Sequence, residues 1–173
     1  ESARPAFADI NSDGLTDLIV GERSGTLNLF LNTGSSTSFS FSSLPNNSSF
    51  GGVDTQVPCC SGFSSPAVDY VNGKLLLAVG SEDGHIYIYD SVQNNTTGNF
   101  KLIDSLVSRS TYLSPALADI NGDLKSDLIL GQLTGGLSYY ENKFGLSYPF
   151  ISNNQSAFKL VPSLCTTKTS VVM

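Results

Sequence analysis

The chain has 173 residues, a formal net charge of −6, 40% hydrophobic residues and only 14% charged residues. A chain of this length forms one ordinary domain, and charged residues normally make up roughly a quarter of such a domain. Nine Lys and Arg residues among fifteen acids cannot form the basic face that nucleic acid or an anionic membrane requires, so nucleic acid is not expected as a partner. No apolar run approaches the roughly 20 residues of a membrane span, so the chain is not expected to be membrane-spanning.

Three segments, at residues 17–30, 76–89 and 127–140, match one another without a gap. Each has an apolar run, a glycine, a second glycine four residues later, and large apolar residues six and eight positions after the first glycine. A short apolar run is typical of a buried strand, and alternating apolar residues are typical of a half-buried neighbour. The paired glycines bracket a tight turn that needs positive φ. The pattern therefore predicts one β-hairpin repeated three times.

Two more strands complete each predicted repeat. A strand that opens with Pro-Ala precedes each hairpin, and a fourth short strand follows it. The predicted first strands are 5–7, 66–68 and 115–117, and the predicted fourth strands are 39–41, 100–103 and 158–161. We see no helical periodicity longer than a turn or two.

Four antiparallel strands that recur about every 50 residues are typical of a propeller blade. One such sheet cannot bury both of its faces, so neighbouring sheets must stack on it. We therefore expect an all-β chain of three four-stranded antiparallel β-propeller blades. The whole chain, 1–173, forms a single propeller segment, with repeats at approximately 1–60, 61–110 and 111–173.

An acidic loop separates the first and second strands of the first and third repeats. Side chains with oxygen atoms stand at loop positions 1, 3, 5 and 9, and position 7 offers its backbone carbonyl. This alternation lets a turning loop aim every second side chain inward, and calcium takes several such oxygen ligands. The predicted ligands are Asp9, Asn11, Asp13, Leu15 and Asp17 in the first loop, and Asp119, Asn121, Asp123, Lys125 and Asp127 in the second. The alternative is a pair of metal-free turns, because Asp, Asn and Gly also form these.

The two acidic loops differ at the sixth position, where a sharp turn favours a residue without Cβ. Gly14 occupies it in the first loop and Leu124 in the second, so the second site is the less certain one. The middle repeat lacks the acidic series at residues 69–74. An ordinary turn without metal is predicted there.

The pattern P-A-x-x-D-x-[ND]-x-D-G-x-x-D-L-x-x-G-x-x-x-G resembles the FG-GAP or VCBS repeats of integrin-like β-propellers and of many secreted bacterial proteins. The resemblance covers nearly the whole chain as three units. The segments 80–84 and 135–142 are also similar to repeat proteins that gliding bacteria export by the type 9 route. The resemblance implies a calcium-stabilised, secreted or cell-surface, extracellular propeller that recognises partners through its loops, with the ligands named above.

We expect a binding or adhesion module whose loops at 35–49 and 91–99 contact a protein or glycan. The alternative is a structural component of a secreted or cell-surface assembly, whose exposed blade faces dock to neighbouring chains. A noncatalytic or glycosidase part of a larger enzyme is a further alternative. The chain itself is not expected to be an enzyme, because its sole histidine, His85, follows a turn glycine and should be solvated, and no nucleophile motif accompanies it.

Three blades are fewer than the four to eight of closed propellers. The chain is then a piece of a longer propeller, a self-associating half of a six-bladed ring, or an open stack sealed by another protein. We favour the first explanation because the loops have diverged and an isolated stack would expose two apolar faces. A bridge from Cys165 to Cys59 or Cys60 is compatible with the sequence, and so are three free thiols.

Overall fold

The computed structural model describes residues 2–58, 61–71, 73–142 and the backbone of 159–161. These residues form eleven strands joined by turns and contain no helix, which confirms the all-β class. The described residues accordingly include no helix long and apolar enough to cross a membrane. Cys59, Cys60 and Cys165 lie outside the described residues.

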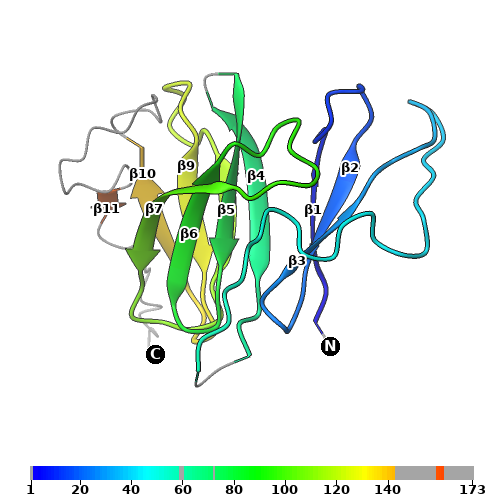
Figure 1. Ribbon diagram of the computed structural model, residues 1–173. Helices are drawn as coiled ribbons and strands as arrows, with labels where there is room; N and C mark the ends of the chain where they lie inside the picture. The colour runs from blue at the N-terminus through cyan, green and yellow to red at the C-terminus, as the bar shows by residue number, and fades with distance from the viewer. Residues whose placement is uncertain (1, 59–60, 72, 143–158, 162–173) are drawn as a thin grey trace, which may run out of the picture.

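The strands form three antiparallel sheets, which we call A, B and C in chain order (Figure 1). Sheet A contains β1 (Arg4–Ala8), β2 (Asp17–Gly21) and β3 (Leu27–Phe30). Sheet B contains β4 (Ser65–Val71), β5 (Lys74–Gly80), β6 (His85–Asp90) and β7 (Lys101–Val107). Sheet C contains β8 (Ser114–Ala118), β9 (Asp127–Gly131), β10 (Leu137–Glu141) and β11 (Lys159–Val161). Sequential strands pair in each sheet, so the three predicted hairpins and their three first strands are confirmed.

The fourth strands follow the prediction in sheets B and C, as β7 and β11, but not in sheet A. Residues 39–41 form no strand, and Phe39 is 78% exposed. The edge of β3 is instead covered by a later, irregular segment: Leu29 N–H donates to the Asn47 carbonyl at 2.7 Å, and Phe50 N–H donates to the Leu27 carbonyl at 2.9 Å. The Phe50 side chain of this segment is fully buried in the apolar core, whereas Phe39 stays outside it.

In sheets A and B, we call the face that packs against the next sheet in chain order the forward face, and the opposite face the backward face. In sheet C the two faces are named by the equivalent residues. In sheet A the forward face carries Ala6, Ala8, Ile10, Ile19, Leu27 and Leu29, and the backward face carries Phe7, Leu18, Val20 and Phe30. In sheet C the equivalent forward residues are Ala116, Ala118, Ile120, Ile129, Leu137 and Tyr139, and the backward residues include Leu117, Leu128, Leu130 and Tyr140.

Two apolar cores hold the three sheets together. The first core lies between sheets A and B, and the second lies between sheets B and C. The central strand β5 serves both, because Leu75, Leu77 and Val79 join the first core while Leu76 and Ala78 join the second. Only the middle sheet therefore buries both faces against described neighbours, which is the stacking that the repeat pattern predicts.

The two glycines of each hairpin have different roles, although we expected positive φ at both of them from the sequence. Positive φ occurs at the second glycine of each pair: Gly25, Gly84 and Gly135. The first glycine instead allows a close approach to the next sheet. A Cβ on Gly21 would lie 2.2 Å from the Ser64 carbonyl oxygen, and a Cβ on Gly80 would lie 2.2 Å from that of Leu113.

Candidate metal-binding loops

The two acidic loops join β1 to β2 and β8 to β9 at one end of the stack, opposite the turns with paired glycines (Figure 1). In the middle repeat, Val71 pairs with Lys74, so only two residues separate β4 from β5. The ordinary turn predicted for that repeat falls partly on residue 72, which lies outside the described residues, and it stays a prediction. The first acidic loop is longer, since β1 ends at Ala8 and β2 begins at Asp17.

The first acidic loop folds around its own side-chain oxygens. The carboxylate of Asp9 accepts the N–H groups of Asp13 at 3.1 Å and Gly14 at 2.9 Å. Asn11 Oδ1 accepts the same Asp13 N–H at 3.3 Å, and Asp13 Oδ1 accepts the Leu15 N–H at 2.8 Å. The side chains at positions 1, 3 and 5 therefore all turn inward, as the alternation predicts.

The second acidic loop repeats these bonds position by position. The carboxylate of Asp119 accepts the N–H groups of Asp123 at 3.2 Å and Leu124 at 2.9 Å. Asn121 Oδ1 accepts the Asp123 N–H at 3.0 Å, and Asp123 Oδ1 accepts the Lys125 N–H at 3.0 Å. The two loops thus share one pattern of hydrogen bonds, although four of their nine residues differ.

The ninth residue of the first loop, Asp17, is fully buried at the start of β2. Its two carboxylate oxygens accept the backbone N–H groups of Ile10 and Asn32, both at 2.9 Å. Burial raises the pKa of Asp17, and the nearby charge of Asp13 adds to the rise, while the backbone hydrogen bonds oppose it. A cation in the loop would offset the cost of holding these two charges together.

Asp127 occupies the same position in the second loop and is also fully buried. It accepts the matching N–H groups of Ile120 at 3.3 Å and Asn142 at 2.8 Å. The Tyr139 hydroxyl adds a third bond at 2.7 Å, which raises the pKa of Tyr139 to about 12. Leu29 stands at the equivalent place in sheet A, so the two buried carboxylates differ in one partner.

Both loops use left-handed backbone at their fourth and sixth positions. The sixth position has φ of 82° at Gly14 and 64° at Leu124. Leucine at such a φ is strained, and the Leu124 side chain is 91% exposed, so packing does not compensate for the strain. Leu124 therefore does not prevent the loop conformation, but it makes that conformation less stable.

Lys125 gives the second loop a cation of its own. Its Nζ lies 2.9 Å from Asp123 Oδ2, and this bond lowers the pKa of Asp123. In the first loop the equivalent residue is Leu15, and Asp13 Oδ2 accepts the Asn11 side-chain amide at 2.8 Å instead. A metal ion at the second loop would have to compete with the lysine ammonium.

The donor atoms of the first loop suit a hard cation. In the part of the chain that the structure describes, no three His, Cys, Asp or Glu side chains form a group that could hold a metal ion by themselves. The predicted set also uses the Asn11 amide oxygen and the Leu15 carbonyl. Three carboxylates, an amide oxygen and a carbonyl are the ligand types that calcium prefers. The residues of the first loop therefore fit calcium in kind, and those of the second fit it less well.

The loop at 91–99, predicted to take part in binding, lies directly against the first acidic loop. Gln93 Nε2 donates to Ser12 Oγ at 3.0 Å, and Asn94 N–H donates to the Ile10 carbonyl at 2.7 Å. Both contacts cross from sheet B to sheet A. The first acidic loop is thereby tied to the next repeat.

The other predicted binding loop, 35–49, joins the same cluster. Asn47 Nδ2 donates to the Thr96 carbonyl at 2.9 Å. A cavity of about 280 Å³ opens between this loop and the acidic loop. It is lined by Gly14, Leu15, Thr16, Asn32, Ser35, Ser36, Thr37, Ser38 and Phe39. The sequence predicted the two loops, but not that they meet beside a metal-like loop.

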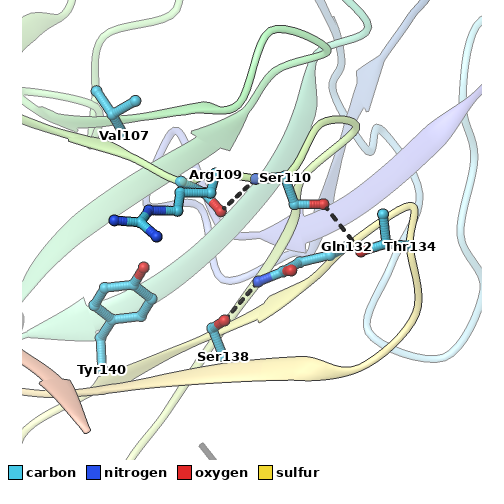
Figure 2. Close-up of a pocket in the computed structure, with 8 residues that line it drawn as sticks. Val107, Arg109, Ser110, Gln132, Thr134, Ser138 and Tyr140 are labelled. Atoms are coloured by element: carbon cyan, nitrogen blue, oxygen red, sulfur yellow. Dashed lines mark hydrogen bonds between the residues drawn. The ribbon is translucent and has the colours of Figure 1, made fainter. Parts of the chain in front are cut away.

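A second pocket, of about 440 Å³, lies between the β7–β8 connection and the β9–β10 turn (Figure 2). Figure 2 shows Arg109 and Tyr140 on one side of it, and the Ser110 hydroxyl within 3.4 Å of the Thr134 hydroxyl on the other. The remaining lining residues are Val107, Ser108, Gln132 and Ser138. No sequence signal identified this pocket, because its two walls come from different repeats.

His85 begins β6 and is half-buried rather than solvated as expected. Its Nδ1 lies 2.9 Å from the Asp83 carboxylate, which also accepts the Ser81 hydroxyl. The Ser81 hydroxyl thus meets the aspartate and not the imidazole, so Ser81 and His85 do not form a nucleophile–base pair with each other. Glu22 and Thr26 hydrogen-bond at 2.6 Å across the equivalent turn of sheet A, which indicates a turn-stabilising arrangement.

No protein-family model matches the chain, and neither does any curated protein or solved structure. The likeness to FG-GAP and VCBS repeats therefore rests on the repeated hairpin and the acidic loops of this chain.

Proposed function

We propose that the chain is a non-enzymatic, calcium-stabilised β-propeller segment of the FG-GAP or VCBS type, secreted or displayed on a cell surface, that binds a protein or glycan. The observation that carries the proposal is the match between the two acidic loops. They share their inward-turning side chains, their left-handed positions and a fully buried aspartate at the ninth position.

The buried ninth residue is what favours calcium over a simple turn. Turn formation needs only the bonds from loop positions 1, 3 and 5 to the backbone. A carboxylate at Asp17, buried and close to Asp13, adds an electrostatic cost that no turn requires. A divalent cation bound between them turns this cost into an attraction.

The surface beside the first loop suits recognition of a polar ligand. Residues 35–38 supply four hydroxyl groups, and Phe39 is 78% exposed at the rim of the cavity, 5.9 Å from Phe41 between ring centres. Aromatic faces and convergent hydroxyl groups bind sugar rings and protein side chains alike. Calcium at the first loop would fix Gly14 and Leu15 as one wall of this cavity.

Calcium binding is tested by calorimetric titration of calcium into chelator-treated protein. We expect a dissociation constant on the order of 0.1 to 1 mM, typical of extracellular modules. Asp13→Asn should weaken binding at the first loop at least tenfold, because it removes a charged ligand. Titrations without any heat of binding, at a temperature where the chain is folded, would contradict the calcium part of the proposal.

Ligand binding is tested on a glycan array and on immobilised cell-surface proteins, with calcium and with chelator. Phe39→Ala should lower the signal, whereas Leu44→Ala, an exposed apolar side chain of the same loop, should not. Equal loss in both variants would show that the cavity is not the site. A blank array and a blank protein panel would count against adhesion as a whole.

The structural alternative, a component of a secreted or cell-surface assembly, is favoured by a different observation. The outermost sheet faces expose large apolar side chains, among them Phe7 at 59% and Leu137 at 66%. Such faces on a soluble chain mark places where other protein surfaces dock.

A further inference from the structure

The forward face of sheet C carries the residues equivalent to those that sheet A buries against sheet B. In sheet A, Ile10 and Leu27 are completely buried against sheet B. Their equivalents in sheet C, Ile120 and Leu137, are 54% and 66% exposed, and Ala116 and Ala118 are exposed beside them. The side chains that form an internal interface in one repeat are thus presented to solvent in another.

The backward face of sheet A shows the converse. Phe7 is 59% exposed, and Leu18, Val20 and Phe30 are half-buried. In sheets B and C the equivalent β-strand positions lie in the cores, as Leu77 and Leu128 do with no exposed surface. The backward face of sheet A is therefore an exposed docking surface, whereas the backward faces of sheets B and C are packed against the preceding sheet.

A glycine marks where the next sheet should approach. Gly21 and Gly80 each leave no room for a Cβ, because the next sheet's entry segment lies 2.2 Å from that position. The equivalent Gly131 has such room, since its nearest neighbour would be the Ser114 oxygen at 3.5 Å. The forward end of sheet C thus keeps the shape that admits another entry segment.

Backbone bonds accompany both internal interfaces at the same place. Phe63 N–H donates to the Arg23 carbonyl at 3.2 Å between sheets A and B, and Tyr112 N–H donates to the Glu82 carbonyl at 3.1 Å between sheets B and C. By the repeat alignment, Leu133 offers the next such carbonyl, at the turn of sheet C. Sheet C therefore offers a further sheet both the apolar side chains and the backbone carbonyl that the internal interfaces use.

We infer that a second copy of this chain docks its sheet A onto sheet C, and that its own sheet C docks back onto the first copy. Each contact continues the internal interface from A to B and from B to C, with a forward face against a backward face. The described residues of two copies bring six sheets together, within the four to eight of closed propellers. We therefore take the chain as the self-associating half of a six-bladed ring, in place of the piece of a longer propeller that we expected from its sequence. A head-to-tail interface that closes on itself leaves no face open.

This inference rests on the propeller part of the proposed function but does not need calcium. We expect the folded chain to sediment as a dimer. Leu137→Asp on the forward face and Phe7→Asp on the backward face should each raise the dissociation constant at least tenfold, because a carboxylate would be buried without a partner. Val107→Asp, an equally exposed apolar residue at 68% on sheet B, is the matched control and should leave the dimer unchanged.

Mixing the two face variants gives the sharpest result. Each variant keeps one intact face, so neither should associate alone, but the mixture should form a one-to-one dimer through the remaining pair of faces. Circular dichroism and thermal melts of each variant separate loss of association from loss of fold. Melts with and without calcium report on the metal loops independently of the dimer.

Three outcomes would overturn the inference. The first is a folded wild-type monomer at about 100 µM, in the range where weak interfaces still associate. The second is association that neither face variant reduces, or that the mixture does not restore. The third is an open series of larger oligomers that both variants dissolve, which would keep the two faces but contradict the closed ring of two copies.

Discussion

Gly21 lies against the carbonyl of Ser64, so closely that an added Cβ would come within 2.2 Å of its oxygen. This contact joins the end of β2 to the chain entering sheet B. It recurs between Gly80 and Leu113, at the entry to sheet C. A backbone atom cannot move aside as a flexible side chain does, so these glycines set the distance between neighbouring sheets.

Gly21→Ala should therefore destabilise the fold by about 2 to 3 kcal/mol, the upper range for forcing atoms into a packed core. Gly131→Ala is the matched control, because its Cβ would meet ordinary contact distances. It should change the free energy of unfolding by less than about 1 kcal/mol. Urea unfolding of both variants at low protein concentration checks this, and equal losses would show that sheet spacing is not the cause.

The sixth loop position should respond to glycine in opposite ways in the two loops. Leu124→Gly removes an exposed leucine from left-handed backbone and should stabilise the fold by about 1 kcal/mol. Gly14→Leu introduces the same strain and should destabilise it by a similar amount. Thermal unfolding of both variants in chelator isolates this effect from metal binding. Destabilisation by Leu124→Gly would mean that the leucine packs against a partner.

Lys125 should limit calcium binding at the second loop. Lys125→Leu places the first loop's seventh residue there, keeps the backbone carbonyl and removes the ammonium from Asp123. We expect the dissociation constant for calcium at this loop to fall about tenfold, measured by calorimetry in the Asp13→Asn background. Lys125→Arg, which keeps the charge, is the control. An affinity unchanged by Lys125→Leu would show that the ion pair does not compete with the metal.

The turn carboxylate Asp83 should give the fold a defined pH dependence. Burial raises the pKa of Asp83, but hydrogen bonds from Ser81 and His85 outweigh burial and leave the pKa below its usual 3.8. A lowered pKa means that the carboxylate stabilises the fold above about pH 4, and that this contribution is lost as the pH falls through the folded-state pKa. Asp83→Asn should cost about 1 kcal/mol at pH 7, the net value of a typical hydrogen bond.

The measurement for Asp83 is the free energy of unfolding in urea between pH 7 and pH 3. The gap between wild type and Asp83→Asn should narrow toward pH 3. Asp104→Asn, in strand β7 of the same sheet, is the control. A gap that stays constant over this range would show that the charge of Asp83 contributes nothing.

The hairpins were predictable because their patterns are local. Two glycines four residues apart and alternating apolar residues fix the turn and the strands within about fourteen positions. The edge of sheet A was not predictable. Phe39 and Phe41 alternate like a strand, but the edge of β3 is already covered by the segment that contains Asn47 and Phe50. Phe50 reaches the core from a segment without alternation, and there it packs on Phe100 with 4.7 Å between the ring centres.

The acidic loops were predictable in their ligand types but not in their differences. Alternation of Asp and Asn indicated which side chains turn inward, and hydrogen bonds within each loop follow that alternation. The ion pair of Lys125 with Asp123 and the Tyr139 hydrogen bond to Asp127 occur only in the second loop, because the equivalent residues of the first repeat are leucines. The two pockets could not be predicted from the sequence, because their walls come from separate repeats or loops.

The central claim is that calcium stabilises this propeller segment through its acidic loops. Its most direct test is the thermal melt of the chain with about 5 mM calcium and with excess chelator, repeated for Asp13→Asn and Asp123→Asn. Calcium at that level should add about 1 to 2 kcal/mol at the first loop, or several degrees in Tm. Asp13→Asn should remove most of the shift and Asp123→Asn little of it. A cooperative melt with the same Tm in calcium and chelator would contradict the claim and leave the loops as metal-free turns.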